Sequence, residues 1–472
     1  MHISSPSFRA ALHIVERLRV CGHQAYMAGG CVRDLLLGIE PTDYDVATSA
    51  RPEEVVGLFP RTFAVGAHFG VILVCTSGED GVGEIKTEVA TFRSDGVYLD
   101  GRRPAEVTYS NSPEEDVQRR DFTINGMLLD PVGLDLADFD PADSAPEKIG
   151  EKVLDFVHGR EDLAAKTVRA IGDAATRFRE DKLRMLRAVR FAARFDFTIE
   201  PETLRAIQHH AADVHSVSNE RIRDELTRML TEGHARRAFE LLDETHLLYQ
   251  VLPEIARMKG VQQPPQFHPE GDVWVHTLLL LEKLPAGASP TLAWGALLHD
   301  IGKPPTFRPP DPSHAKPRIR FDGHAEVGTT MARELLNRFR FSNDEIAQIT
   351  ALVANHMRFG DVRQMRPATL KRFFRLNDFP EHLQLHWMDA SSAHGDLSLY
   401  HYAKEQYEAT PVESHKPALL LTGRDLIDAG LKPGPRFKDL LHQLEDAQLE
   451  GAIRTRDEAI NMLRTLLAER SI

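Results

Sequence analysis

Cysteine is scarce in this sequence, and its three cysteines (Cys21, Cys31 and Cys75) have neither metal-ligand nor disulfide spacing. This scarcity predicts a protein of a reducing compartment, so we expect a cytoplasmic location and structural roles for all three residues. Long apolar runs are also missing. None reaches about 18 residues, which excludes a transmembrane helix and predicts no membrane partner. The N-terminal stretch mixes charged with apolar positions and has no signal-peptide pattern.

Basic residues are outnumbered, with 57 Lys and Arg against 70 Asp and Glu and a net charge of −13. This balance argues against a large nucleic-acid footprint, because phosphate binding needs clustered Lys and Arg. The distribution matters more than the sum, since residues 166–194 contain nine basic and three acidic residues. The acidic total therefore hides a basic helical patch. With 472 residues and 42% hydrophobic content, the chain is long enough for about three globular domains.

Internal repeats and a low-complexity tail are absent, so periodicity and polar breaks define the organisation. The first part mixes predicted helices (7–20 and 32–37) with strand patterns rich in β-branched residues (24–28, 44–47, 70–76 and 85–92). From about residue 150 onward, the pattern is almost purely helical. Polar or proline-rich breaks occur at 138–147, 262–270, 303–317 and 409–418. We therefore predict four parts: 1–145, 146–260, 261–408 and 409–472.

The segment GGCVRDLLLGIEPTDYDVATS, from Gly29 to Ser49, carries the first candidate site. If Asp43 and Asp45 belong to a strand, their carboxylates share one face and Tyr44 lies on the other. Such a pair suits Mg²⁺, which prefers carboxylate oxygens and keeps substrate phosphates as further ligands. Taken alone, an Asp-x-Asp sequence is more often an acidic turn.

Neighbouring residues favour the metal site over the turn. Gly29 and Gly30 follow a predicted strand and open a predicted helix, where backbone N–H groups can approach a triphosphate closely. Arg33 follows within the first turn and can clamp the same phosphates. The Gly-Lys-Ser/Thr ending of a Walker A loop is absent, so this is a different kind of phosphate site.

This string resembles the head-domain signature of the class II tRNA nucleotidyltransferase and bacterial poly(A) polymerase family, within the DNA polymerase beta superfamily. The resemblance implies that Glu88, in Glu88-Val89-Ala90-Thr91-Phe92-Arg93, completes the metal site with a third carboxylate. An exposed strand residue is the alternative for Glu88. Residues 95–107 resemble the flexible loop of the family, and their glycines make mobility plausible.

The sequence Arg-Arg-Asp-Phe-Thr-Ile-Asn, residues 119–125, matches a second family signature. The resemblance implies that Arg120 binds phosphate and that Asp121 and Asn125 bind ribose hydroxyls. A surface ion pair at a strand end is the alternative interpretation.

A predicted helix around residues 180–184 (Glu-Asp-Lys-Leu-Arg) carries a pair that could select a base. Asp181 and Arg184 are three residues apart, so they share a helix face. An aspartate accepts from an exocyclic amine, and an arginine donates to ring nitrogens and carbonyls, which suits cytosine and adenine. The family uses Glu-Asp-x-x-Arg as its amino-acid template for CTP and ATP, and implies that Arg187 and Arg190 also line the pocket. A solvated basic helix face is the alternative.

A second candidate site has the sequence pattern of an HD metal-dependent phosphohydrolase domain, formed by His276, His299, Asp300 and Asp389. Imidazoles and carboxylates suit a divalent metal, which can activate water for attack on a phosphoester. Three further residues accompany this pattern, with His324 and His356 where two-metal members have extra ligands and Lys303 able to neutralise substrate phosphate. The alternative to a metal site is that these histidines lie in the core with their hydrogen bonds made within the protein. Turnover, metal and substrate stay open, with 2′,3′-cyclic RNA ends or phosphomonoesters as candidates.

The resemblance extends to residues 421–426 and 430–435 near the C-terminus and so covers nearly the whole chain. It implies an α+β protein with a polymerase-beta-like nucleotidyltransferase head (1–145), a helical neck that binds RNA largely by backbone shape (146–260), an HD domain (261–408) and a helical tail (409–472). The leading hypothesis is a Mg²⁺-dependent enzyme that adds CCA to tRNA 3′ ends from CTP and ATP. Alternatives are a poly(A) polymerase, a partial CC- or A-adding enzyme, or an HD phosphohydrolase with an RNA-binding head. Oligomeric state stays open.

Overall fold

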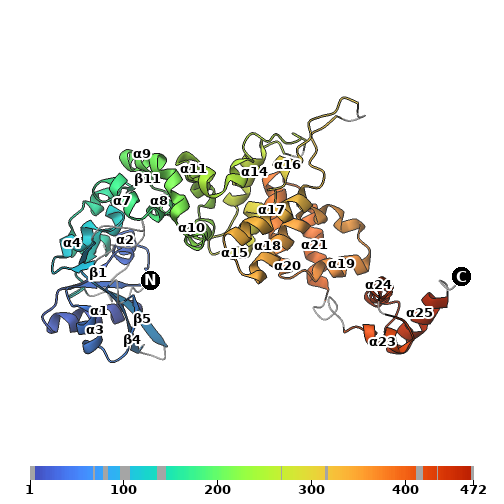
Figure 1. Cartoon of the computed structure of the whole chain (residues 1–472), viewed down its shortest axis with the longest axis horizontal. Coiled ribbons are helices and arrows are strands. Elements are labelled where there is room, and N and C mark those ends of the chain that lie inside the picture. The colour runs from blue at the N-terminus through green and yellow to red at the C-terminus, as the bar shows by residue number, and fades with distance from the viewer. Residues whose placement is uncertain are drawn as a thin grey trace. The chain divides into compact units, whose positions relative to one another are not determined.

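The computed structural model describes residues 6–66, 70–77, 83–95, 107–134, 145–266, 268–313, 317–410, 418–432 and 434–468. The chain forms two compact units, residues 1–253 and 254–472 (Figure 1). Most of the predicted flexible loop at 95–107, most of the predicted boundary at 138–147 and most of the predicted break at 409–418 lie outside the described residues. Within the described part, the structure contains no helix with the length and apolar character that crossing a membrane requires.

A seven-stranded sheet, in the order β3-β4-β5-β2-β1-β8-β9, organises the first unit. β2 and β5 run parallel, whereas the other neighbouring strands run antiparallel. Its strands are β1 (Ala25–Ala28), β2 (Asp45–Thr48), β3 (Thr62–Gly66), β4 (Val71–Ser77), β5 (Glu84–Thr91), β8 (Met127–Leu129) and β9 (Val153–Asp155).

The strands predicted from β-branched patterns are confirmed as β1, β2, β4 and β5, each within about two residues. β8 and β9 were not predicted, because three-residue segments are too short to show an alternating pattern. β9 pairs with β8 and belongs to the same sheet, so the head sheet continues to Asp155, beyond the predicted limit of 145.

Helix α1 (Pro6–Val20) covers one face of the sheet and decides which way the acidic pair points. Its apolar residues recur at helical spacing and are buried, and Phe8 packs edge-on against Tyr44 at 5.5 Å. Tyr44 is therefore held beneath α1, whereas Asp43 and Asp45 stay accessible. The predicted alternation around Tyr44 is confirmed. A second apolar cluster, which includes Phe92, Val117 and Leu128, packs beside the central strands.

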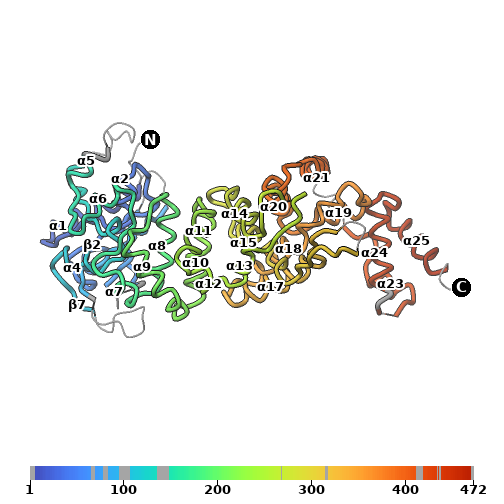
Figure 2. The backbone as a smooth tube through the Cα atoms, turned by 90° about the horizontal axis from the view of Figure 1, so that it is seen from above, coloured from blue at the N-terminus to red at the C-terminus, as the bar shows by residue number. Residues whose placement is uncertain are grey.

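Helices dominate the rest of the first unit. α8 packs against both α10 and α11 (Figure 2). Nine of its side chains are buried. The helices are α2 (Gly30–Leu36), α3 (Pro52–Leu58), α4 (Pro113–Gln118), α5 (Ala145–Glu151), α6 (Gly159–Ala164), α7 (Ala174–Glu180), α8 (Leu183–Arg194), α9 (Pro201–His210), α10 (Asn219–Thr231), α11 (Ala235–Glu244) and α12 (Leu247–Val251), and α13 (Pro253–Ala256) begins at the last residue of this unit. Two short ribbons, β6 (Arg93–Asp95) with β7 (Val107–Tyr109) and β10 (Thr167–Val168) with β11 (Thr198–Ile199), complete it.

The described part of the second unit is helical apart from one isolated β-bridge between Arg308 and Arg320. α14 and α15 are apolar on nearly all sides, which is typical of helices in a core. The helices are α14 (Val273–Glu282), α15 (Pro290–Leu298), α16 (Lys303–Thr306), α17 (His324–Arg338), α18 (Asn343–Asn355), α19 (Pro367–Phe374), α20 (Phe379–Ser392), α21 (Ser398–Ala409), α23 (Gly423–Asp428), α24 (Pro435–Glu450) and α25 (Arg456–Ala468), with a 3₁₀ segment at His356–Gln364.

The predicted C-terminal segment forms a small core of its own. Leu421 and Leu426 are buried together with apolar residues of α24 and α25. Arg372 and Arg375 on α19 form ion pairs with Glu445 on α24 at 3.1 and 2.5 Å, which ties this core to the helices before it. The predicted fold class, a small N-terminal sheet followed by helices, is confirmed.

Candidate functional site

One cavity of the first unit, with a volume of about 740 Å³, brings together every residue predicted for metal and nucleotide binding in the head and neck. The predicted residues lie on α2, β2, β5 and α8 and on the connecting segments around them. They are Gly29, Gly30, Arg33, Asp43, Asp45, Glu88, Arg120, Asp121, Asn125, Asp181, Arg184, Arg187 and Arg190.

We call this cavity the nucleotide pocket. Its floor carries three of the predicted carboxylates, those of Asp43, Asp45 and Glu88. Val46 pairs with Val89 in the parallel ladder of β2 and β5, which puts Asp45 beside Glu88 on neighbouring strands. Asp45 is open to the cavity, but the protein atoms around its carboxylate displace part of its hydration. This partial desolvation, followed by the charges of Asp43 and Glu88, raises the pKa of Asp45 to about 7. A site that concentrates oxygen ligands and negative charge in this way fits a hard divalent cation such as Mg²⁺.

The predicted phosphate residues are already held by protein partners. Gly29 has φ of 78°, and a Cβ there would lie 3.2 Å from Nη1 of Arg120, so the glycine permits this close approach. Arg120 forms an ion pair with Asp116 at 2.9 Å. Arg33 is only 4% exposed, donates to Oδ1 of Asn125 at 2.5 Å and lies over the ring of Phe195. Arg33 therefore also fastens α2 to α8.

Asp121, predicted to contact the ribose, is also held by protein partners. Its Oδ2 accepts from Nε of Arg187 at 2.8 Å, and its Oδ1 accepts from Asn125 at 3.2 Å. Burial alone would raise the pKa of Asp121, but the charge and hydrogen bonds of Arg187, with help from Arg184 and Asn125, lower it to about 2. Asp121 is therefore ionised at neutral pH.

The helix predicted across residues 180–184 is interrupted, and this part of the prediction is wrong. α7 ends at Glu180, Asp181 is extended (φ −139°, ψ 106°) and α8 begins at Leu183. The reason is local, because Oδ1 of Asp181 accepts from the backbone N–H of Leu183 at 3.0 Å and so competes with helix continuation. Both predicted base-reading residues nevertheless line the nucleotide pocket.

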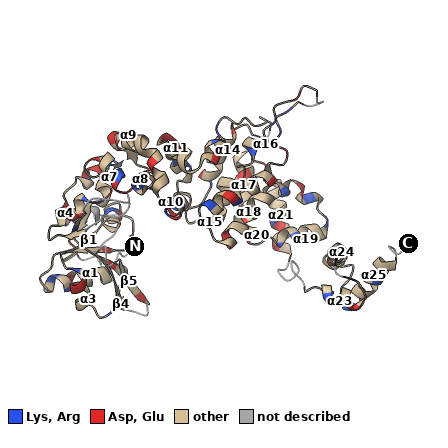
Figure 3. Ribbon diagram, viewed as in Figure 1, with Lys and Arg blue, Asp and Glu red and all other residues tan. Residues whose placement is uncertain are grey.

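The arginines around this break have separate partners. Arg184 donates to Oε2 of Glu180 at 2.7 Å and to the carbonyl oxygen of Arg119 at 2.9 Å. Arg190 is 3% exposed and donates to Glu225 at 2.7 Å. Lys and Arg positions, blue in Figure 3, recur along α7 and α8. The predicted basic patch is therefore largely paired, and Arg190 is a buried residue rather than an exposed one.

Sequence reasoning missed one face of α10. Four of its charged residues line the nucleotide pocket or bind the arginines of α8, namely Arg221, Glu225, Arg228 and Glu232 at the C-terminal end. Arg221 forms an ion pair with Asp181 at 2.8 Å. The spacing in the sequence could have indicated this face, because residues four, seven and eleven positions after Arg221 lie on the same side of a helix.

The second unit brings the predicted HD residues together from five separate elements. His276 lies on α14, His299 and Asp300 directly follow α15, and Asp389 lies on α20. Nε2 of His276 is 3.1 Å from Asp389, and Nε2 of His299 is 3.1 Å from Oδ2 of Asp300. His324 and His356 approach Oδ1 of the same aspartate at 3.6 and 3.8 Å.

Gly302 makes this convergence possible. A Cβ at Gly302 would lie 2.1 Å from the carbonyl oxygen of His324 and 2.6 Å from the backbone nitrogen of Gly328. The turn that carries Asp300 can therefore touch the first turn of α17 only when residue 302 has no side chain. We call this group of six residues, His276, His299, Asp300, His324, His356 and Asp389, the histidine centre.

Each imidazole of the histidine centre turns Nε2 inward, because its Nδ1 faces an acceptor. Nδ1 of His276 donates to Glu270 at 2.8 Å, and those of the other three donate to backbone carbonyl oxygens of Ala296, Phe321 and Val353 at 2.7–2.9 Å. Partners of this kind fix the tautomer in metal-binding histidines. Nε2 of His324 then lies 3.2 Å from Nε2 of His356, so a proton or a cation has to separate the two lone pairs.

Charge in the histidine centre also suits a cation. Burial lowers the pKa of His356 to about 4, so its Nε2 carries a lone pair at neutral pH. Burial would lower the pKa of His276 too, but Asp389 and Glu270 raise it to about 9, so a proton occupies Nε2 until a cation displaces it. The N and O donors fit a divalent metal. Lys303, 2.7 Å from Asp300, neutralises that carboxylate and is buried.

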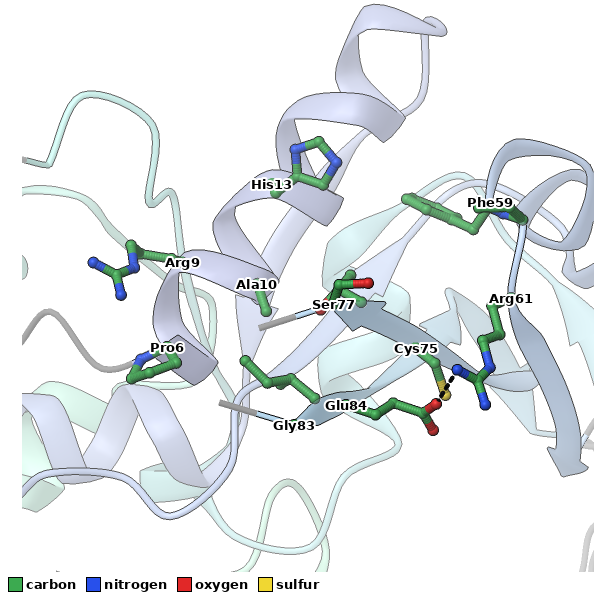
Figure 4. Close-up of a pocket in the computed structure, with 13 residues that line it drawn as sticks. Pro6, Arg9, Ala10, His13, Phe59, Arg61, Cys75, Ser77, Gly83 and Glu84 are labelled. Carbon is green, nitrogen blue, oxygen red and sulfur yellow. Dashed lines mark ion pairs between the residues drawn. The ribbon is translucent and has the colours of Figure 1, made fainter. Parts of the chain in front are cut away.

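A cavity of about 600 Å³ opens onto the histidine centre. Asp300, Lys303, His324, His356 and Asp389 line it, together with Arg318, Arg320, Phe321 and Met357. It therefore combines cations with apolar side chains around the candidate metal ligands. A larger cavity of about 930 Å³ lies elsewhere, beside α1, β4 and β5 (Figure 4). It contains none of the predicted site residues, and its Arg61 and Glu84 pair with each other at 2.5 Å.

Comparison with protein families matches three stretches of the chain. Residues 25–169 match the poly(A) polymerase head domain, residues 196–259 match the probable RNA and SrmB-binding site of polymerase A, and residues 324–463 match the putative tRNA nucleotidyltransferase domain 2. The CCA-adding enzyme of Levilactobacillus brevis is 31% identical over 456 residues, which are 96% of each chain. The chain belongs to the CCA-adding enzyme family.

Further relatives of the family agree with this assignment. The CCA-adding enzyme of Streptococcus mutans is 31% identical over 97% of each chain. The crystal structure of the Bacillus stearothermophilus CCA-adding enzyme in complex with CTP is 26% identical, with a TM-score of 0.70, and the match covers 99% of this chain and 100% of that one. The protein is therefore a nucleotidyltransferase, and its fold is that of the family. The head-domain match ends at residue 169, later than the predicted limit of 145.

Proposed function

We propose that this protein adds C, C and A to the 3′ end of tRNA, using CTP and ATP and no nucleic-acid template. The observation that carries the proposal is the nucleotide pocket, where a carboxylate floor, an arginine wall and the pair Asp181 and Arg184 meet in one cavity of about 740 Å³. A nucleoside triphosphate needs these three kinds of group, for its metal ion, its phosphates and its base. The named relatives, which are CCA-adding enzymes and include one crystallised in complex with CTP, support it.

In this proposal, Asp43, Asp45 and Glu88 hold Mg²⁺, which neutralises charge on the phosphates when bound. The 3′-hydroxyl of the RNA attacks the α-phosphate, and pyrophosphate leaves. Catalysis then consists mainly of positioning and charge neutralisation. Arg120 lies beside Gly29 at the phosphate end, Asp121 and Asn125 hold the ribose, and Asp181 with Arg184 selects the base.

Incubating the protein with tRNA that lacks CCA, with each labelled nucleotide in turn, tests the proposal. We expect CMP to be incorporated twice and AMP once, and sequencing of the product should give CCA. Incorporation of AMP in long runs would replace the proposal with a poly(A) polymerase, and failure to incorporate CMP would replace it with an A-adding enzyme. Failure of all nucleotides would leave the head as an RNA-binding module.

A second candidate function, hydrolysis of phosphoesters at the histidine centre, rests on its four inward Nε2 atoms. His276, His299, Asp300 and Asp389 would hold a divalent metal ion, with His324 and His356 available for a second ion on the other oxygen of Asp300. Bound metal would supply an activated water. Arg318 and Arg320 in the adjoining cavity suit a phosphate, and Phe321 and Met357 suit an apolar group such as a base.

Metal binding and hydrolysis should be measured separately for this centre. Equilibrium dialysis with Mn²⁺, Co²⁺ and Ni²⁺, followed by elemental analysis, should show ions retained by the unmodified chain and lost from His276→Ala. Hydrolysis of a 2′,3′-cyclic nucleotide and of a phosphomonoester should then be assayed with each metal. Retention of metal without hydrolysis would assign the centre a structural role, and absence of retention would contradict the metal site.

A further inference from the structure

Among the described residues, Asp181 receives three hydrogen bonds, and two of them come from α10. Arg221 donates from Nη1 to Oδ1 at 3.3 Å and from Nη2 to Oδ2 at 2.8 Å, and the backbone N–H of Leu183 donates to Oδ1 at 3.0 Å. A carboxylate offers about four acceptor positions. Both positions of Oδ1 are thus used, and one position of Oδ2 is left.

This count matches the hydrogen bonds that a base needs. An exocyclic amine, at N4 of cytosine or N6 of adenine, offers a donor for the remaining position of Oδ2. Arg184 uses three of its five N–H groups, on Glu180 and on the carbonyl oxygens of Arg177 and Arg119. The two that remain can donate to ring nitrogen and carbonyl acceptors. Uracil and guanine place a carbonyl oxygen where the amine would be, and that oxygen would face a lone pair of Asp181.

The fork of Arg221 also fixes the plane of the carboxylate. Asp181 lies in the break between α7 and α8, where no helix constrains its side chain. Two parallel N–H···O bonds from a planar guanidinium hold both oxygens at once, which a single donor cannot do. Without Arg221, only the bond from Leu183 would remain, and Oδ2 could rotate away from the amine.

α10 anchors Arg221 through a second contact with α8. Glu225, one turn after Arg221, accepts from Arg190 at 2.7 Å and lies 4.0 Å from Arg187. Arg190 and Glu225 are 3% and 5% exposed. Because buried, hydrogen-bonded ion pairs are costly to break, this contact keeps the facing sides of the two helices in register.

We propose that Arg221 is a positioning residue for base selection, which holds Asp181 so that a single acceptor faces the exocyclic amine of cytosine or adenine. The proposal rests on the proposed nucleotide addition but concerns its selectivity. Arg221 does not touch the reacting phosphate, and it acts through Asp181.

The test compares Arg221→Gln and Arg221→Lys with the unmodified chain. Titration calorimetry with CTP and UTP, with Mg²⁺ present, gives the binding preference, and competition between the two nucleotides on tRNA that lacks CCA gives the selectivity of transfer. We expect Arg221→Gln to reduce the preference for CTP over UTP at least about tenfold. Arg221→Lys should have a smaller effect, because one ammonium replaces the two-point contact.

Arg223→Gln is the matched control, because Arg223 lies two residues along the same helix and pairs with Asp224 at 2.9 Å. It should leave the preference unchanged. If Arg221 only stabilised packing, Arg221→Gln would weaken both nucleotides equally and lower the melting temperature, and the proposal would be wrong.

A double-mutant cycle makes the test independent of folding. In a chain that already carries Asp181→Asn, adding Arg221→Gln should cause no further loss of CTP preference, whereas independent roles would give additive losses. Binding without transfer in the unmodified chain would contradict the proposed function but still report on Arg221. An unmodified chain that binds CTP and UTP equally would overturn the inference itself.

Discussion

The nucleotide pocket and the histidine centre satisfy their polar groups in opposite ways. In the pocket, the groups expected to bind substrate already have protein partners, such as Arg187 for Asp121 and Asp116 for Arg120. In the histidine centre, the inner atoms face one another and the ammonium of Lys303, and Nε2 of His276 and of His299 have no well-aligned hydrogen-bond partner among the described residues. A pocket for substrates that come and go can exchange partners, whereas a buried set of inward-facing donors is suited to hold a bound cation.

The strongest test of this contrast is Asp45→Ala. Loss of one of three carboxylates from the pocket floor should lower the rate of nucleotide addition by at least about a thousandfold, because charge neutralisation supplies most of the catalysis in phosphoryl transfer. Single-turnover addition to tRNA measures the effect. Hydrolysis at the histidine centre and the melting temperature should not change. Loss of both activities in a folded protein would contradict two independent sites.

The converse change, His299→Ala, should act only on the histidine centre. Removing a ligand should weaken metal binding by more than about a hundredfold, since losing even an outer partner costs about 10–100-fold. Metal content after dialysis measures this, with Asp45→Ala as the matched control. Nucleotide addition should stay within about twofold of the unmodified rate, and a large loss would show that the two sites depend on each other.

A smaller effect concerns His382, a buried histidine of the second unit that is not a candidate ligand. It is 1% exposed, and neither ring nitrogen has a hydrogen-bond partner among the described residues. Burial, opposed by Glu381 and reinforced by Arg358, lowers its pKa to about 4. Below about pH 6.5, His382 is protonated in the unfolded chain but still neutral in the folded chain. The free energy of unfolding therefore falls as pH drops from about 6.5 to 4.

His382→Leu should therefore flatten the pH dependence of stability. Between pH 7 and pH 5, the unmodified protein should lose about 1–2 kcal/mol more unfolding free energy than the variant, as measured by urea denaturation at both pH values. His210→Leu, which removes a histidine of the first unit, is the control, and it should not flatten the pH dependence of the unfolding free energy in the same way. An unchanged slope in His382→Leu would show that this ring is protonated or bonded in the folded protein.

The smallest expected effect is at the larger cavity beside α1. Arg61 is 64% exposed and pairs with Glu84 across its edge. Exposed pairs contribute about 0–1 kcal/mol, so Arg61→Ala should leave the melting temperature and the rate of nucleotide addition almost unchanged. Thermal denaturation and the tRNA assay measure both. A marked fall in rate would assign this cavity a role that its residue composition does not suggest.

The sequence predicts ligand sets better than it predicts contacts. Asp43 and Asp45 could be proposed together from the alternation around Tyr44, Glu88 could be added from the family resemblance, and all three line one pocket in the structure. The partners of the arginines could not be derived, because an ion pair between α8 and α10 depends on how the two helices cross. Arg190 shows this well, since its place on a basic helix suggested an accessible side chain, yet Glu225 and Glu232 enclose it.

The break at Asp181 escaped prediction for a different reason. Leu183 to Arg194 has strong helical periodicity, and extending that pattern backwards over Glu180 joined two helices into one. The deciding interaction is a single hydrogen bond from the Leu183 N–H to the Asp181 side chain. Aspartate is compatible with a cap, a turn or a helix, and the sequence alone does not show which of these its side chain forms.

The bond from Arg184 to the carbonyl oxygen of Arg119 has a consequence beyond base selection. It ties a base-reading side chain to the backbone directly before Arg120 and Asp121, the proposed phosphate and sugar contacts. This bond therefore links the proposed base contact to the proposed phosphate and sugar contacts and holds the two at a set separation. We therefore expect a nucleotide analogue with correct hydrogen-bonding edges but one extra atom between base and sugar to bind more weakly than the natural nucleotide.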